Sequence, residues 1–282
     1  MSKKTSTSPT PEGERLQKKL ASAGLGSRRE IERWIVEGRL KINGKLAKLG
    51  DRVIDEDQIT LDDRPLNQKK LINIQHKTLI YNKPEGELVT RSDPEGRPTV
   101  FSRLPALEKG RWIAVGRLDI NSAGLLLFTT DGELANRLMH PAQQIEREYA
   151  VRVMGEVNDD MLKQLVNGVE LEDGFARFED IVESGGSGIN RWFHVVIMEG
   201  RKREVRRLWD AVGVRVNRLK RVRFGTVILD SSVKSGQWRD LEHKELKDLM
   251  QLAGLKMQQG NRPKAETSKK TGRKSSPWKK KQ

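Results

Sequence analysis

The chain has 282 residues, a length typical of about two domains, and its 54 lysines and arginines against 39 aspartates and glutamates give a net charge of +15. Such an excess favours a polyanionic partner. The absence of cysteine excludes disulfides and thiolate zinc sites, and the four histidines are too scattered to form a metal-binding pair. We therefore expect no metal. No apolar run is long enough for a membrane span or a secretory signal, which favours a cytoplasmic protein.

Both ends of the chain are polar, and we predict disordered tails at residues 1–13 and 254–282. Residues 256–282 contain ten basic residues and one acidic residue. Two explanations of this excess stay open. The tail is either a solubilising extension or an arm that tethers RNA by charge alone.

Residues 14–74 are predicted to form a small αβ domain. A first helix ends at Gly24, and Ser27 and Glu30 have the spacing of a capping box that begins a second helix. Asn43-Gly44, between two short alternating runs, predicts a β-hairpin. A unit of this size with basic outer faces suits binding better than catalysis, although a generic small domain with a solvated basic surface is the alternative.

The run RLQKKLASAGLGSRREIERWIVEGRLKINGKLAKLGDRV closely resembles the RNA-binding domain first known from ribosomal small-subunit protein four. The resemblance includes the SRRE step and the NGK hairpin. It implies that Arg28 and Arg29, at the start of the second helix, contact RNA.

A second domain is predicted over residues 75–253, after a polar linker at residues 64–76. The predicted strands are Leu79–Tyr81, Trp112–Val115, Leu125–Thr129, Tyr149–Val153, Trp192–Met198 and Leu219–Phe224. The predicted helices are Glu133–Met139, Asp159–Gly168, Arg203–Val212 and Leu241–Leu252. Because the strands come in groups with few helices between them, we expect an α+β fold with a largely antiparallel mixed sheet flanked by helices, and not a doubly wound fold.

The polar loop GRLDINSAG, at residues 116–124, lies between two predicted buried strands. A rigid scaffold on either side would let Asp119 present its carboxylate to a substrate, with Arg117 beside it. The alternative is a turn aspartate that hydrogen-bonds only to nearby backbone.

The segment from Glu199 to Arg223 has ten basic residues and three acidic ones. Val205, Leu208, Trp209 and Val212 follow a helical spacing, so the helix is expected to pack on a core while its arginines face outward. A fixed arginine face suits phosphate contacts, although a merely solvated face is the common alternative.

Four segments together resemble the RsuA-type branch of the pseudouridine synthases. They are KPEG at residues 83–86, GRLDINSAGLLLFTTDGELANRL at 116–138, REYAVRV at 147–153 and EGRKREVRRLWDAVG at 199–213. With the small domain, the resemblance covers nearly everything between the tails. The segment YNKPEGELVTRSDPEGRPTVFSRLP, at residues 81–105, is most similar to members of the branch that act on large-subunit ribosomal RNA.

The resemblance implies that the enzyme isomerises a uridine to pseudouridine without a cofactor. Asp119 would be the covalent catalyst, Arg206 its cationic partner, and Tyr149 the residue that stacks on the extruded uracil. The resemblance further implies that Arg117 steadies the catalytic loop. Arg203 and Arg207 would contact substrate RNA and are also close alternatives to Arg206 as the partner of Asp119. Lys83, with Pro84 and Gly86, would be either structural, because proline and glycine fix a turn, or in contact with substrate RNA.

The implied partner is 23S ribosomal RNA or a large-subunit assembly intermediate, with uridine 2605 as the implied target, and we expect a monomer. Two rival functions stay open: a non-catalytic ribosomal RNA-binding assembly factor, and a sister synthase that acts on a different uridine.

Overall fold

The structure, a computed structural model, describes residues 13–67, 71 and 76–257. The predicted tails at residues 1–12 and 258–282 lie outside the described residues. Residues 254–257, which we assigned to the second tail, do not extend away from the fold, because Leu255 and Met257 pack against an apolar cluster of the large domain.

The small domain combines two helices with short strands. Its elements are β1 (Glu14–Arg15), α1 (Leu16–Ser22), α2 (Arg28–Val36), β2 (Leu40–Ile42), β3 (Lys45–Leu46), β4 (Arg52–Val53), β5 (Ile59–Leu61) and β6 (Arg64–Pro65). The predicted capping box is present, since the Ser27 hydroxyl accepts from the Glu30 N–H and the Glu30 carboxylate accepts from the Ser27 N–H, both at 3.1 Å. Asn43 and Gly44 have φ of 50° and 80°, the left-handed pair that a two-residue hairpin of type I′ requires.

The segment that we predicted to be a linker, residues 64–76, is partly folded into the small domain. Arg64 and Pro65 form β6, which pairs with β5, and the Leu71 side chain is buried in the core of the small domain. Residues 64–66 therefore belong to the small domain, whose sheet has the order β3-β2-β5-β6.

The large domain is built on one mixed sheet. Its strands are β7 (Thr78–Lys83), β8 (Ile113–Val115), β9 (Ala123–Thr129), β10 (Arg147–Met154), β11 (Val169–Leu171), β12 (Gly174–Ala176), β13 (Asp180–Ser187), β14 (Asn190–Ile197), β15 (Arg215–Phe224), β16 (Val227–Ile228) and β17 (Trp238–Asp240). Its helices are α4 (Gly132–Met139), α5 (Asp159–Asn167), α6 (Glu204–Ala211) and α7 (His243–Leu252), with short 3-10 turns η1 (Val100–Arg103) and η2 (Pro141–Gln143).

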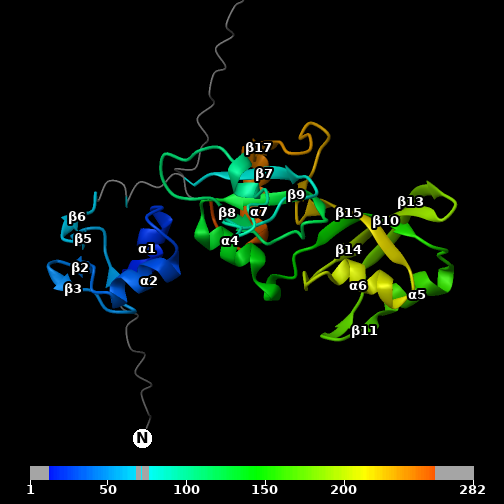
Figure 1. Ribbon diagram of the computed structural model, residues 1–282, viewed down its shortest axis with the longest axis horizontal. Helices are drawn as coiled ribbons and strands as arrows, with labels where there is room; N and C mark the ends of the chain where they lie inside the picture. The colour runs from blue at the N-terminus through cyan, green and yellow to red at the C-terminus, as the bar shows by residue number, and fades with distance from the viewer. Residues whose placement is uncertain (1–12, 68–70, 72–75, 258–282) are drawn as a thin grey trace, which may run out of the picture.

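The main sheet has the strand order β13-β14-β10-β15-β9-β7-β17, with β16 beside β15 and β8 beside β9 (Figure 1). The pairing of β9 with β15 is parallel and the other strand pairs of this sheet are antiparallel. The α+β fold with a largely antiparallel mixed sheet is confirmed, as is every strand and helix expected between residues 79 and 252.

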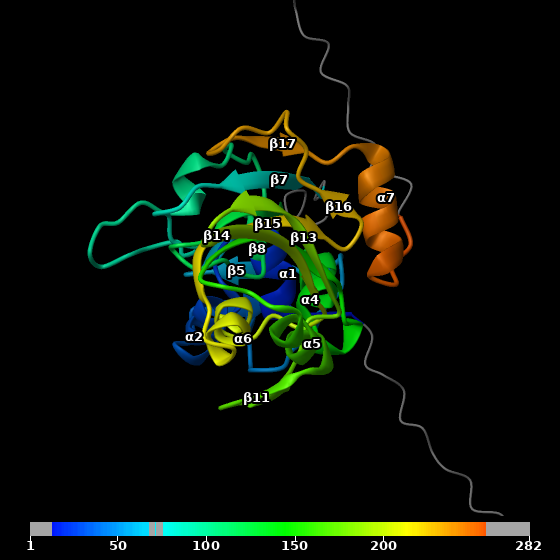
Figure 2. The ribbon, with the colours of Figure 1, turned by 90° about the vertical axis from the view of Figure 1, so that its right-hand side faces the viewer.

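Successive side chains of the strands point to opposite faces of the sheet and pack into two apolar clusters, one on each face. Tyr81 and Phe128 face a cluster that α5 and α6 cover, whereas Ile80 and Leu127 face a cluster that α4 and α7 cover. Figure 2 shows α5 and α6 together on one side of the twisted sheet and α7 away from them. Each face is thus closed by a pair of helices.

The edge strand β13 is the main element that the sequence pattern does not reveal. Its sequence, DIVESGGS, contains polar residues and two glycines, and Val182 is exposed because the strand pairs with β14 on one side only. Edge strands lack the two-sided burial that produces a clear hydrophobic signature.

Gly124 occupies the point where β9 and β15 approach each other most closely. It has φ of +100°, and a Cβ atom placed there would lie 2.2 Å from the Arg221 carbonyl oxygen. Only glycine permits both this backbone conformation and the parallel register that places Gly124 opposite Arg221.

Replacing Gly124 by alanine is expected to lower the free energy of unfolding by more than the roughly 1–2 kcal/mol that left-handed backbone costs alone, because the new methyl group also displaces β15. The matched control is Gly116→Ala, where φ is +80° but nothing lies within 4 Å of the added carbon. Urea unfolding followed by tryptophan fluorescence compares the two variants. Equal destabilisation would contradict the steric argument.

Candidate active site

The loop from Gly116 to Ser122 connects β8 to β9 and carries the candidate nucleophile. Arg117 and Asp119 are exposed, whereas Leu118 between them is only 7% exposed and packs into the cluster under α5 and α6. The buried leucine anchors the loop, so that its two charged neighbours project outward. The carboxylate of Asp119 is therefore accessible to a substrate.

The backbone carbonyls of the loop accept from one donor within the loop and from donors in two other segments. The Asp119 carbonyl accepts from the Ser122 N–H at 3.1 Å and closes a tight turn. The Ile120 carbonyl accepts from the Gly86 N–H at 2.8 Å, and the Asn121 carbonyl accepts from Arg206 at 2.8 Å. The backbone is thus fixed, whereas the Asp119 side chain forms no hydrogen bond or ion pair with the residues that the structure describes.

Lys83 lies beneath this loop and is completely buried. Its ammonium donates to the carbonyls of Ser122 at 2.8 Å, Pro84 at 3.0 Å and Asp119 at 3.1 Å. Of the two roles expected for Lys83, the structure favours the structural one over a contact with RNA, because no part of its side chain reaches the surface. Its position assigns it to holding the Asp119 loop.

Burial lowers the pKa of Lys83 to about 8, against the opposing fields of Glu87, Glu85 and Asp119. The side chain remains an ammonium at pH 7. The buried ammonium of Lys83 is stabilised by carbonyl dipoles and by the fields of nearby carboxylates, and it forms no direct ion pair with another described residue.

Arg206, on α6, is 8% exposed and links two elements of the site. Its guanidinium donates to the Val216 carbonyl of β15 and to the Asn121 carbonyl of the loop, each at 2.8 Å. Burial, and then the neighbouring Arg203, lower its pKa, while Asp119 and Glu85 oppose that shift. Arg206 thus attracts Asp119 through space and positions its loop, without forming an ion pair with it.

Tyr149, on β10, is 7% exposed and belongs to the cluster under α5 and α6. Arg221 on β15 is the register partner of both Tyr149 and Gly124, where the Asp119 loop ends. Because neighbouring strands lie about 4.8 Å apart, Tyr149 and Gly124 are about 10 Å apart across the sheet. Tyr149 thus lies two strands from the end of the Asp119 loop, with β15 between them.

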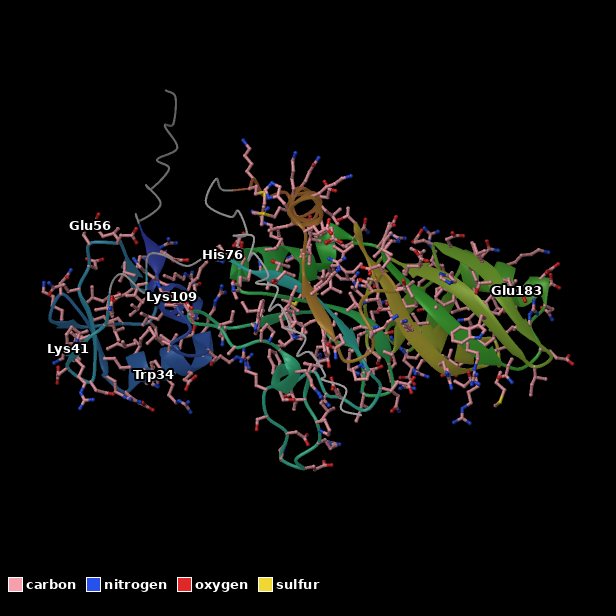
Figure 3. The ribbon with its side chains drawn as sticks, turned by 90° about the horizontal axis from the view of Figure 1, so that it is seen from above. Trp34, Lys41, Glu56, His76, Lys109 and Glu183 are labelled. Atoms are coloured by element: carbon pink, nitrogen blue, oxygen red, sulfur yellow. The ribbon has the colours of Figure 1, made fainter. Side chains whose placement is uncertain are left out.

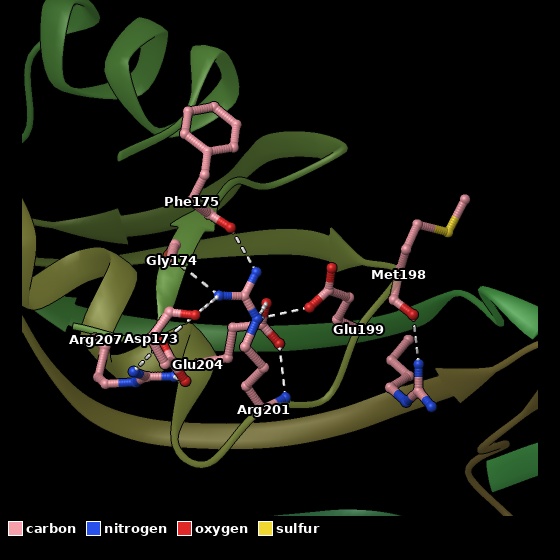
Figure 4. Close-up of polar contacts among 9 residues, drawn as sticks. Asp173, Gly174, Phe175, Met198, Glu199, Arg201, Glu204 and Arg207 are labelled. Atoms are coloured by element: carbon pink, nitrogen blue, oxygen red, sulfur yellow. Dashed lines mark hydrogen bonds and ion pairs between the residues drawn. The ribbon is translucent and has the colours of Figure 1, made fainter. Parts of the chain in front are cut away.

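Arg203 caps the start of α6 and Arg207 lies within the helix, and their surroundings differ. Arg203 is exposed and lies near Arg206, which fits its predicted place at the site. Arg207 instead forms a two-pronged ion pair with Asp173, at 2.6 and 2.9 Å, on the turn between β11 and β12 (Figure 4). Arg207 is therefore engaged by Asp173 and not by Asp119, and its predicted contact with RNA stays a prediction.

Arg201 is similarly occupied. It donates to the carbonyls of Gly174 and Phe175 and pairs with Glu199 at 2.6 Å (Figure 4). Part of the basic segment thus holds the β11–β12 hairpin, and only part faces outward. The sequence does not reveal the roles of Arg201 and Asn121, because their partners lie in remote segments.

Arg28 and Arg29 lie far along the chain from Asp119, on α2 of the small domain. Both are exposed and, within the part of the chain that the structure describes, neither takes part in an ion pair. Their charges are available to an anionic partner, and their contact with RNA stays a prediction.

The site combines an accessible carboxylate on a fixed backbone with cationic groups around it. Such an arrangement suits nucleophilic or acid–base chemistry on an anionic substrate. Among the described residues, no three histidine, aspartate or glutamate side chains are grouped to hold a metal ion. No helix in residues 13–67, 71 and 76–257 is long and apolar enough to cross a membrane.

Comparison with known families matches the two domains separately. Residues 77–211 match the family described as RNA pseudouridylate synthase, and residues 14–59 match the S4 domain. The structure is similar to one titled "Crystal structure of pseudouridylate synthase", with a TM-score of 0.58 and 28% identity, over 83% of this chain and 99% of that one.

Three relatives carry the description "Ribosomal large subunit pseudouridine synthase B". That of Yersinia pestis is 58% identical, over 86% of this chain and 77% of its own. That of Escherichia coli O157:H7 is 57% identical, over 86% and 84%. That of Pseudomonas aeruginosa is 58% identical over 87% of this chain, which spans only 64% of the relative's length. The chain belongs to the pseudouridine synthase family.

The depressed pKa of Lys83 predicts a pH dependence of stability. The unfolded chain binds the proton up to about 10.5, whereas the folded chain releases it near 8. Between these values the unfolded state holds more protons, so the contribution of Lys83 to the free energy of unfolding rises with pH. Urea unfolding of the wild type and Lys83→Met from pH 7 to above pH 10 measures this contribution as their difference. The free energy of unfolding of the wild type minus that of Lys83→Met should increase as pH rises. A value that stays constant or decreases would contradict the argument.

Proposed function

We propose that the protein converts a uridine of large-subunit ribosomal RNA to pseudouridine, with Asp119 as the covalent catalyst. The observation that carries the proposal is the exposure of the Asp119 carboxylate on a loop whose carbonyls are bound by Lys83, Gly86 and Arg206. The names of the relatives support the large-subunit substrate.

The reaction requires no oxidant and no net change in atoms. The bond between N1 of uracil and C1′ of ribose breaks, the base turns, and C5 bonds to C1′. The proton on C5 leaves and N1 gains one. A carboxylate can serve as the covalent catalyst only when ionised, and the cationic surroundings favour that form. No step needs a metal or an organic cofactor.

The remaining site residues have separable roles in this proposal. Arg206 and Lys83 position the loop through its carbonyls, and Arg206 also stabilises the carboxylate through space. Tyr149 stacks on the extruded uracil at the edge of the buried cluster. Arg117 and Arg203, both exposed, contact the RNA beside the flipped nucleotide.

The finer proposal is that the substrate is 23S ribosomal RNA, free or in a large-subunit assembly intermediate, and that uridine 2605 is the target. An accessible single-stranded or loosely paired uridine suits base extrusion best. The small domain would supply affinity through Arg28 and Arg29, which is directed at phosphates and not at sequence.

Asp119→Asn is expected to lower product formation by at least roughly a thousandfold while RNA affinity stays within a few-fold, because the amide keeps the shape of the carboxylate but cannot act as the nucleophile. The measurement is primer extension after carbodiimide modification, on ribosomal RNA from a deletion strain complemented with each variant. Asp210→Asn, an exposed carboxylate on α6 that also acts on Arg206, is the control and should keep activity.

The same experiment separates the rivals. A carbodiimide stop at a different uridine would identify a sister synthase. The absence of any stop that depends on the wild-type protein, with ribosome assembly rescued by Asp119→Asn, would identify a non-catalytic assembly factor. A persistent stop with Asp119→Asn would refute the catalytic assignment.

Arg206→Lys is expected to reduce product formation by about a hundredfold, because lysine keeps the charge but cannot bridge the Val216 and Asn121 carbonyls with a planar fork. Arg207→Lys, one residue further along α6, is the matched control, since it changes only a pair with the half-exposed Asp173. Single-turnover assays on unmodified 23S transcript compare them. Equal rates for the two variants would show that Arg206 does not position the loop.

A further inference from the structure

The small domain touches the large domain through the turn that follows α1. A Cβ atom at Gly24 would lie 2.6 Å from the Gly110 carbonyl oxygen, so the two backbones are in direct contact. Figure 3 accordingly shows Lys109 beside the helices of the small domain. We call the contact of residues 22–30 with residues 109–113 the junction.

Three arginines gather at the junction. Arg111 directly follows Gly110, and Arg91 donates to the carbonyl of the adjacent Trp112 while its guanidinium lies 4.5 Å from the Phe101 ring centre. Arg28 arrives from the small domain, with its Nη2 3.8 Å from the position of a Cβ on Gly132. Ile113 lies 3.7 Å from the same position, which places Arg28 next to the start of β8.

None of the three arginines forms an ion pair with another described residue, and the Nε of Arg111 is buried and finds no hydrogen-bond acceptor. Glu30 attracts Arg111 through space, but its carboxylate accepts a hydrogen bond from the Ser27 N–H of the capping box. An unpaired, partly buried guanidinium is unfavourable unless a ligand completes its hydrogen bonds.

The electrostatics agree with the geometry. Burial lowers the pKa of Arg111, and the nearby charges of Arg91 and Arg28 lower it further. Burial also lowers the pKa of Arg91. The charges of Arg91 and Arg28 therefore raise the free energy of the Arg111 cation, and a bound anion would lower it.

We propose that the junction is a phosphate-binding site, in which Arg28, Arg91 and Arg111 hold one backbone phosphate of the substrate RNA between the two domains. This inference rests on the proposed function for the identity of the anion. Arg111 and Asp119 are eight positions apart along the chain, so their Cα atoms are at most about 29 Å apart. One RNA molecule can therefore occupy the junction and the Asp119 loop together, which fixes the orientation of the small domain.

The test uses the full chain and measures the affinity for a fluorescein-labelled RNA hairpin as a function of salt. Loss of one phosphate contact reduces the salt slope by about one and weakens binding roughly three- to tenfold. We expect this result for both Arg111→Gln and Arg28→Gln. Arg111→Lys, which keeps the charge, should restore most of the slope. The control is Lys247→Gln, an exposed lysine on α7 that should leave the slope unchanged.

Arg28 is exposed, so its substitution tests the site even if Arg111→Gln weakens the fold. Unchanged affinity and slope in Arg28→Gln, or in a folded Arg111→Gln, would overturn the inference. Pseudouridine formation at saturating 23S transcript provides the separate test of function. If the wild type is inactive but the arginine variants lose salt dependence, the proposed function fails and the phosphate site stands.

Discussion

The burial of the Lys83 ammonium against the backbone of the Asp119 loop is the interaction on which the site depends. An exposed loop between two strands would ordinarily be free to move, and a nucleophile on it would lose the orientation that catalysis needs. Lys83 satisfies carbonyls from below, so rigidity is supplied without covering the carboxylate above. Leu118 adds an apolar anchor from the same loop.

Several arginine side chains in this protein donate hydrogen bonds to backbone carbonyls of distant segments. Arg206 holds the Asn121 carbonyl, Arg221 holds the Leu125 carbonyl, and Arg147 holds the Met198 carbonyl. Such contacts replace water at carbonyls that strand pairing leaves unsatisfied. Many arginines near the site are therefore not available to bind RNA. Arg117 and Arg203, which are exposed and form no ion pair with another described residue, are better candidates for that contact.

Local patterns in the sequence were sufficient for most elements. The capping box of Ser27 and Glu30 and the apolar runs of β7 and β9 have signals within a few residues, and both were predicted correctly. The position of Asp119 followed from its loop and from the family motif. The roles of Lys83 and Arg207 did not, because Lys83 meets Ser122 across 39 positions and Arg207 meets Asp173 across 34. No periodicity connects residues so far apart, and a lysine or arginine viewed alone is expected at the surface.

The parallel contact between β9 and β15 has a consequence for the order in which the protein matures. The Asp119 loop is bound by Arg206 from 85 positions further along the chain, and its last strand pairs with residues 220 and 221. During translation the family motif leaves the ribosome long before these partners do. The nascent chain therefore carries Asp119 on an unsupported loop until residues 206–221 have been made, so the candidate site can assemble only after most of the large domain has been synthesised.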